Sequence, residues 1–220
     1  MCITLVALAS ACGVGAHPKA NIDWISFVQV RGRQYVAVRS LGARATSPAV
    51  LGRAVATVRK TLAGHVFDPH YRPRDGDAAF LPVGTQLREV RGFAPWFRLG
   101  ALVDGDVTIY QLDRRDGTGA EVFDLDASAI RSLEIRRASD DSLERTVTDP
   151  ALVHRLVAAI ERARVRATDV TDEDATCVVA FTYADTPPIA LQYRASSGTL
   201  SPGIRLDAAL RHDLAGVGCG

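Results

Sequence analysis

Short apolar runs separated by glycine and proline turns dominate the first half of the chain. The runs at residues 23–30 and 34–38 contain β-branched and aromatic side chains and predict a β-hairpin that turns at residues 31–33. Further runs of this kind predict five strands, at 54–62, 78–81, 86–90, 97–103 and 107–112. Short strands at this spacing favour a small barrel or sandwich over alternating strands and helices. Residues 53–62 also fit a helical stripe, so a helix remains an alternative there.

The second half of the chain has a different pattern. Residues 113–128 are polar and contain glycine, which makes them the best candidate for the boundary between the halves. After them, four strands are predicted, the first two as a hairpin: 130–135, 142–148, 177–183 and 189–193. We therefore divide the folded chain into a β-rich subdomain, residues 23–127, and an α+β subdomain, residues 128–220.

Two helices are predicted in this second subdomain. Asp149 can accept hydrogen bonds from exposed backbone N–H groups, and Pro150 suits the first helical position, so a helix begins there. Apolar residues follow at helical spacing and form one face: Val153, Leu156, Val157 and Ile160. A second, shorter helix is expected over 207–214 and ends at Gly216. The expected fold class is α+β: a β-rich N-terminal half, then an antiparallel sheet with one main packed helix.

The chain begins with 11 uncharged, mostly apolar residues. This run is far shorter than the roughly 20 residues that span a bilayer. Small residues lead to Cys12, and a linker of few bulky apolar groups follows over 12–22. The arrangement resembles the end of a bacterial lipoprotein signal peptide, which implies that residues 1–11 are removed and that the Cys12 thiol carries a lipid anchor. The alternative is a buried N-terminal strand.

The remaining cysteines fit an exported protein. If Cys2 is removed and Cys12 is acylated, Cys177 and Cys219 are left, and they can close a disulfide around a loop of about 40 residues. Such a bridge would hold the glycine-containing C-terminal tail. Two unpaired thiols are the alternative.

Composition excludes one class of partner and offers little catalytic chemistry. The chain has 26 basic and 25 acidic residues, so it lacks the excess of Lys and Arg that binding to a phosphate backbone requires, and no nucleic acid is expected. No Gly-x-Ser-x-Gly or Ser-x-x-Lys motif is present. The compact group His65, Asp68 and His70 offers zinc ligands for a metal-dependent enzyme or hydrolase of the envelope. An exposed loop without metal is favoured instead, and no cofactor is expected.

The most suggestive surface candidate contains arginine and aromatic residues, both frequent at binding hot spots: Arg91, Phe93, Trp96 and Arg98. The loop 92–96 could present its aromatic rings to a partner. In the alternative interpretation, Phe93 and Trp96 close the end of a small β core. An acidic run at 169–174 lacks the alternating ligands and central glycine of a calcium loop, and a solvated loop is favoured.

The run Gly76-Asp77-Ala78-Ala79-Phe80-Leu81-Pro82-Val83-Gly84-Thr85, followed by Val90-Arg91-Gly92-Phe93 and Phe97-Arg98-Leu99, carries a family resemblance. It is similar to a group of uncharacterised secreted lipoproteins of high-GC Gram-positive bacteria. The resemblance implies location and architecture but no activity. The expected function is a lipid-anchored extracytoplasmic protein of the cell membrane that acts as a binding or interaction module, with an envelope protein or ligand as its partner.

Overall fold

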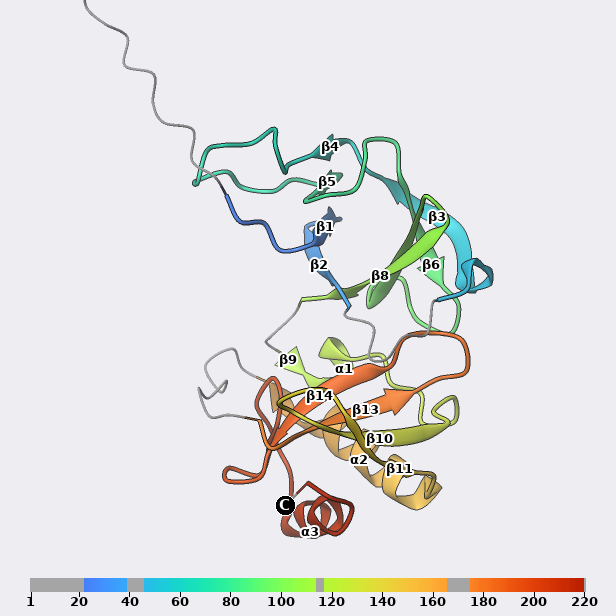
Figure 1. Cartoon of the computed structure of the whole chain (residues 1–220), viewed down its shortest axis with the longest axis vertical. Helices are drawn as coiled ribbons and strands as arrows, with labels where there is room; N and C mark the ends of the chain where they lie inside the picture. The colour runs from blue at the N-terminus through green and yellow to red at the C-terminus, as the bar shows by residue number, and fades with distance from the viewer. Residues whose placement is uncertain (1–21, 39–45, 114–116, 166–174, 220) are drawn as a thin grey trace, which may run out of the picture.

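The computed structural model describes residues 22–38, 46–113, 117–165 and 175–219, which form two large sheets with helices packed on the second (Figure 1). The first sheet and its loops occupy the upper part of the view. The second sheet lies below it, with helix α3 at the end of the molecule that is distant from the first sheet. The predicted α+β class with a β-rich first half is confirmed.

The first sheet has eight strands in the spatial order β3-β6-β7-β8-β2-β1-β5-β4. Their bounds are β1 Phe27–Val30, β2 Arg33–Ala37, β3 Leu51–Thr57, β4 Lys60–Thr61, β5 Asp77–Ala78, β6 Gln86–Val90, β7 Arg98–Val103 and β8 Asp106–Leu112. Neighbouring strands are antiparallel except β4 and β5. The sheet curls into a half-barrel, and side chains such as Val28, Leu99 and Tyr110 fill its interior.

Most predicted strands of the first half are present. β1 and β2 form the expected hairpin, in which Phe27 pairs with Val36. Gly32, in its turn, has a φ of 72°, a left-handed backbone conformation that glycine adopts at little cost. The helical alternative at 53–62 is wrong, because β3 pairs along β6 and β4 pairs with β5. The strand predicted at 78–81 is shorter, since β5 ends at Ala78. A single 3-10 turn, η1 (Pro48–Val50), precedes β3.

The second sheet has the order β11-β10-β13-β14-β15-β16, with every neighbouring pair antiparallel. Its strands are β10 Ser132–Arg137, β11 Leu143–Val147, β13 Cys177–Thr182, β14 Ile189–Arg194, β15 Thr199–Leu200 and β16 Ile204–Arg205. The predicted hairpin and the two later strands are therefore confirmed. β15 and β16 were not predicted, because two-residue strands leave no periodic pattern in the sequence.

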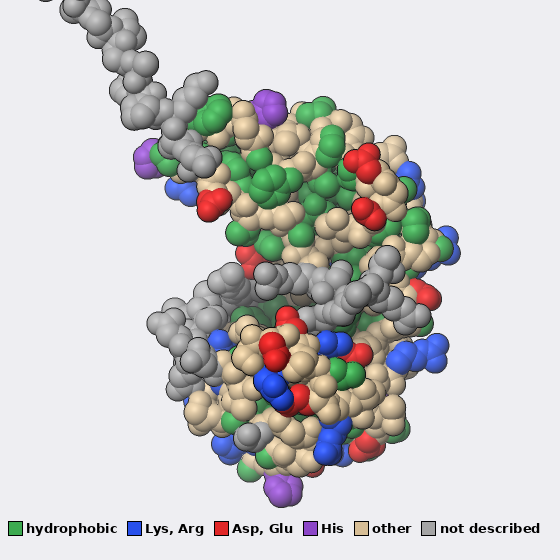
Figure 2. All heavy atoms as spheres, viewed as in Figure 1, with side chains coloured by type: hydrophobic (Ala, Val, Ile, Leu, Met, Phe, Trp, Pro, Cys, Tyr) green, Lys and Arg blue, Asp and Glu red, His purple; other side chains and the backbone are tan. Residues whose placement is uncertain are grey.

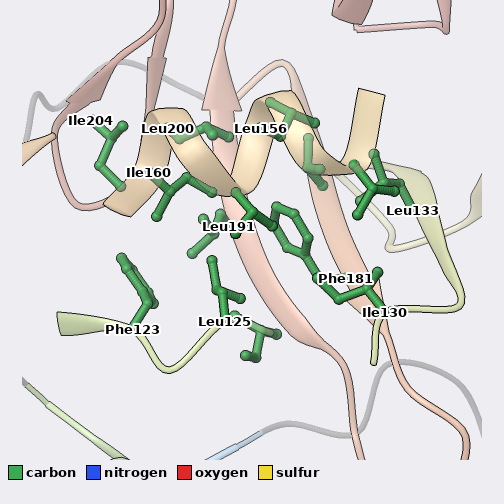
Figure 3. Packing of buried hydrophobic residues seen from close by; sticks show 14 of the residues in the cluster. Phe123, Leu125, Ile130, Leu133, Leu156, Ile160, Phe181, Leu191, Leu200 and Ile204 are labelled. Atoms are coloured by element: carbon green, nitrogen blue, oxygen red, sulfur yellow. The ribbon is translucent and has the colours of Figure 1, made fainter. Parts of the chain in front are cut away.

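Helix α2 (Pro150–Arg162) covers the second sheet as its amphipathic pattern predicts. Asp149 caps the helix by accepting a hydrogen bond from the Ala151 N–H at 2.9 Å. In Figure 3, Leu156 and Ile160 of α2 lie over Leu191 and Phe181 of the sheet, and all four side chains are buried. Helix α3 (Ala208–Gly216) is capped by Asp207 and adds Leu210 and Leu214 to the same core.

The polar segment at the predicted boundary packs against α2. It contains β9 (Gly117–Thr118) and the short helix α1 (Gly119–Val122), and β9 pairs with β12 (Arg164–Val165) directly after α2. The Gly119 N–H donates to the Ala163 carbonyl oxygen at 2.8 Å. Residues 117–125 thus join the second half, although the division at residue 127 assigned them to the first. Three apolar side chains drive this packing: Val122, Phe123 and Leu125.

One apolar cluster continues from the second sheet into the first. Val90, Phe97 and Ile109 of the first half belong to the same buried cluster as Phe123 and Leu125. This continuity means that the two halves are joined through packed side chains as well as through the chain itself. The surface features that lie at this junction therefore have walls from both halves.

Candidate binding groove at the junction

Arg98, a predicted binding residue, is completely buried at the start of β7. Its Nε and Nη2 atoms donate to Gln111 Oε1 at 3.0 and 2.8 Å. Nη1 and Nη2 donate to the carbonyl oxygens of Pro187 and Pro188 at 2.7 and 2.9 Å, and the guanidinium lies 4.6 Å from the centre of the Phe93 ring. A ligand on the surface cannot reach this group, so the structure corrects the assignment of Arg98 to a binding surface.

Burial changes the pKa of Arg98 but not its charge at neutral pH. Burial lowers the pKa of Arg98 to about 10, against the smaller opposing effects of Tyr183 and Asp124. The guanidinium therefore remains positively charged at neutral pH. Carbonyl dipoles, the Gln111 amide and two aromatic rings surround it, and among the described residues it has no ion pair with a carboxylate.

The aromatic residues of the same loop pack inward. Phe93 is 9% exposed and meets the Tyr183 ring edge-on at 4.9 Å. Trp96 is partly buried and contacts Phe97, with the ring centres 5.8 Å apart. These contacts agree with the alternative interpretation, in which Phe93 and Trp96 close the end of a β core. Of the four predicted binding residues, Arg91 alone is exposed.

A groove of about 590 Å³ lies beside Arg91 and Phe93. Its walls come from four segments, around 47–50 and 91–93 in the first half and around 128–131 and 183–186 in the second. The volume is in the range of small-molecule sites, which occur preferentially where two structural units meet. We call this feature the junction groove. It contains Arg91 and Phe93 of the predicted surface, but neither Trp96 nor Arg98.

Two hydroxyl groups of the junction groove have unusual surroundings. Tyr183 Oη and Thr186 Oγ1 are buried and have no hydrogen-bond partner among the described residues. Burial is also the main reason why the pKa of Tyr183 is raised. Buried polar atoms almost always have a partner, so such an exception requires an explanation, for example a water molecule or a ligand.

Charged side chains at the groove are also free. Arg91, Arg131 and Asp185 are exposed, and none of them has a side-chain hydrogen bond or ion pair within the part of the chain that the structure describes. Arg91 follows β6, Arg131 precedes β10, and Asp185 lies in the turn between β13 and β14. No motif in the sequence singles out Tyr183, Thr186 or Arg131, because only the fold brings these turns together.

The histidine loop does not gather a ligand set. His65, Asp68 and His70 are exposed; Asp68 Oδ1 accepts from the His70 backbone N–H at 2.9 Å, and the His65 ring lies 3.0 Å from the Ala63 carbonyl oxygen. In the described ranges, no three His, Cys, Asp or Glu side chains converge as a metal site would require. The acidic run 169–174 lies outside the described residues.

Cys177 and Cys219 form a disulfide, as predicted. The bond joins β13 to the residue that follows α3 by three positions, with a Cα–Cα distance of 5.5 Å and a sequence separation of 42. Both cysteines are buried. Disulfides of this kind are typical of extracellular and other oxidising environments. Cys12 lies outside the described residues.

The remaining surface offers other features with less definite chemistry. In Figure 2, hydrophobic side chains gather over the first half, whereas basic and acidic side chains alternate over the second. Exposed apolar residues of the first half include Ile25, Phe80 and Val83. Two smaller hollows, of about 460 and 300 Å³, share Gln111, Gln192 and neighbouring residues of β8 and β14.

Comparison of the chain with protein-family models, with curated proteins and with solved structures gives no match. In the described ranges, every helix is too short or too polar to cross a membrane.

Proposed function

We propose that this chain is a lipid-anchored extracytoplasmic protein that serves as a binding module at the cell envelope, and that the junction groove is its ligand site. The binding role is carried by one observation. The groove is lined by two residues whose buried hydroxyls have no partner among the described residues, and by charged side chains that no described residue neutralises. An isolated fold gains nothing from leaving the two buried hydroxyls unsatisfied, and the exposed charged side chains, which have no described protein partner, are available to a ligand.

The location is supported independently of the groove. The start of the chain resembles a lipoprotein signal peptide that ends before Cys12, and the run at 76–85 resembles secreted lipoproteins of high-GC Gram-positive bacteria. The buried disulfide between Cys177 and Cys219 suits an oxidising compartment. An acyl chain on Cys12 would place the groove within reach of molecules at the outer face of the membrane.

Metabolic labelling with a fatty-acid probe tests the anchor. The gene is expressed with its natural upstream region, and wild-type protein is compared with Cys12→Ser and with Cys2→Ser after membrane fractionation. Because the proposal assigns the lipid to Cys12 and removes Cys2 with the signal peptide, we expect Cys12→Ser to lose the label and Cys2→Ser to keep it. Unlabelled wild-type protein, or equal labelling of all three proteins, would contradict the anchor.

A further inference from the structure

The free groups of the junction groove are mostly hydrogen-bond donors. Arg91 and Arg131 each offer a guanidinium with five N–H donors and no acceptor. Tyr183 Oη and Thr186 Oγ1 add two hydroxyl groups that lack a partner among the described residues. Against these, Asp185 is the one free carboxylate in the lining. A molecule that fills this groove must therefore supply many acceptor atoms.

The neighbouring carboxylates are already engaged. Asp124 accepts a hydrogen bond from the Ala94 N–H, and Asp126 accepts from both the N–H and the hydroxyl of Ser128. Arg98 is also unavailable, because its donors are directed to Gln111 and to the two proline carbonyls. The side-chain donors that remain for a ligand are those of Arg91, Arg131, Tyr183 and Thr186, together with the hydroxyl of Ser47, whose oxygen accepts from the Ala49 N–H.

Tyr183 is suited to donate its hydroxyl proton. A tyrosine hydroxyl is protonated at neutral pH, and burial raises the pKa of this phenol further. The Tyr183 ring is fixed by its edge-on contact with Phe93 at 4.9 Å. The hydroxyl is therefore preorganised, and an acceptor oxygen that reaches it would remove the cost of an unpaired buried donor.

Apolar side chains complete the walls. Val50, Phe93, Ala49 and Ala129 all line the groove; the first two are buried and the two alanines are exposed. A fully hydrated inorganic ion would leave this apolar surface uncovered, whereas a molecule with an apolar part would bury it.

We propose that the junction groove binds a small molecule that carries an acceptor-rich anionic group, a carboxylate or a phosphate, next to an apolar portion. The anionic group lies against Arg91 and Arg131. The hydroxyl oxygens of Tyr183 and Thr186 are buried, so the group accepts from them after a side-chain shift at the groove wall. The apolar portion lies against Phe93 and Val50. This inference rests on the proposed binding function and adds the chemical class of the ligand.

Titration of the folded protein with four probes, followed by amide NMR shifts, tests the ligand class. Phenyl phosphate and benzoate carry the anionic group in its two forms, and benzamide and benzyl alcohol are neutral molecules of similar size. We expect at least one anionic probe to bind with a Kd on the order of 1 mM and to shift the amides of Gly92, Ala129 and Thr186. The neutral probes should bind about tenfold more weakly or not at all. The ratio of the Kd values of phenyl phosphate and benzoate identifies the preferred anion.

Variants connect this binding to the groove. Arg91→Gln and Arg131→Gln should each raise the Kd of the anionic probe about tenfold or more, because a charge-assisted hydrogen bond is lost. Arg72→Gln is the matched control, since Arg72 is also exposed but lies in the first half away from the groove lining. Ala129→Trp should block the groove for all probes.

Tyr183→Phe separates a binding role from a structural one. The substitution removes a hydroxyl that has no described partner, so we expect unchanged or slightly higher thermal stability together with weaker probe binding. A clear loss of stability would instead indicate a structural bond to this hydroxyl.

Three outcomes would overturn the inference, and they differ in what they mean for the proposed function. Equal binding of neutral and anionic probes in the groove, unaffected by Arg91→Gln and Arg131→Gln, rejects the anionic class and keeps the groove as a ligand site. Shifts that map away from the groove, or no binding by any probe, reject both the class and the groove. The lipid anchor is tested separately, by the fatty-acid labelling of Cys12.

Discussion

Arg98 Nη1 donates a hydrogen bond of 2.7 Å to the carbonyl oxygen of Pro187, 89 positions further along the chain. This bond connects the first strand residue of β7 to the turn before β14, and so links the two halves of the molecule. The same guanidinium also binds Pro188 and Gln111. A proline carbonyl keeps its acceptor capacity although the residue lacks an N–H, and here two successive carbonyls are directed at one cation.

Replacement of Arg98 should loosen this junction. Arg98→Met keeps much of the side-chain volume but leaves Gln111 Oε1 and the Pro187 and Pro188 oxygens without their donor, so we expect a loss of about 2–4 kcal/mol in the free energy of unfolding. Urea denaturation measures the loss. Arg72→Met, at an exposed position, should change stability by less than about 0.5 kcal/mol. Equal stability of the two variants would show that the buried bonds contribute nothing.

The sequence predicts much of this fold, because most of its longer elements have their own periodicity. The pattern at 150–162 includes a cap, a first-turn proline and one apolar face, and each feature acts within a few residues. β9 and β12 have no such local signal, and α1 has only a capping box, in which Glu121 accepts from the Thr118 N–H at 2.7 Å. They depend on a close approach between Gly119 and the end of α2 that only the folded chain creates.

Gly119 is the residue that allows this approach, and its replacement should be strongly destabilising. A Cβ atom on Gly119 would lie 1.6 Å from the Ile160 carbonyl oxygen, a clash with backbone that no side-chain rotation relieves. We expect Gly119→Ala to lower the free energy of unfolding by about 3 kcal/mol or more, measured by urea denaturation.

Gly216→Ala provides the matched control for that substitution. Gly216 is the last residue of α3, and a Cβ atom there would meet no atom of the described residues within 4 Å. Because alanine is the better helix former, this variant should be neutral or more stable by up to about 1 kcal/mol. If both alanine variants are tolerated alike, α1 does not pack on α2 as described.

The disulfide should contribute a large share of the stability of the second half. Its sequence separation of 42 corresponds, by the chain-entropy model, to about 4 kcal/mol. We therefore expect the double variant Cys177→Ala/Cys219→Ala to lose up to that amount in chemical denaturation. Reductant should destabilise the wild-type protein and leave the double variant unchanged. Insensitivity of the wild type to reductant during unfolding would show that the bond is absent in solution.

The residues of the junction groove could be predicted only in part from the sequence. Arg91 and Arg98 belong to one short run and have the same side chain, yet one is exposed at the groove and the other is completely buried. Position in a strand decides the difference, because Arg98 opens β7 on the face that meets the Pro187-Pro188 turn. Tyr183 and Thr186 become candidates only when the fold isolates their hydroxyls from every described partner.

Alkaline pH should unfold the protein through its buried tyrosines. Burial is the largest cause of the raised pKa values of Tyr35, Tyr110, Tyr183 and Tyr193. An unfolded tyrosine loses its proton near pH 10, so above that pH these four tyrosines bind fewer protons in the unfolded chain than in the folded one. Arg98, whose pKa burial lowers to about 10, acts in the opposite direction and offsets part of this effect. The contribution of these tyrosines to the free energy of unfolding is therefore fully present below about pH 10. It is lost as the pH rises through their pKa values in the folded protein.

A spectrophotometric titration followed together with circular dichroism checks this prediction. We expect phenolate absorbance to lag behind that of the urea-denatured chain and then to rise cooperatively as the secondary structure is lost. Tyr183→Phe removes one of the four linked groups, so its alkaline unfolding should be less steep and should begin at higher pH. The phenolate absorbance could instead follow the same pH curve as that of the denatured chain while the circular dichroism remains native. That result would show that these hydroxyls are accessible to solvent in the folded protein.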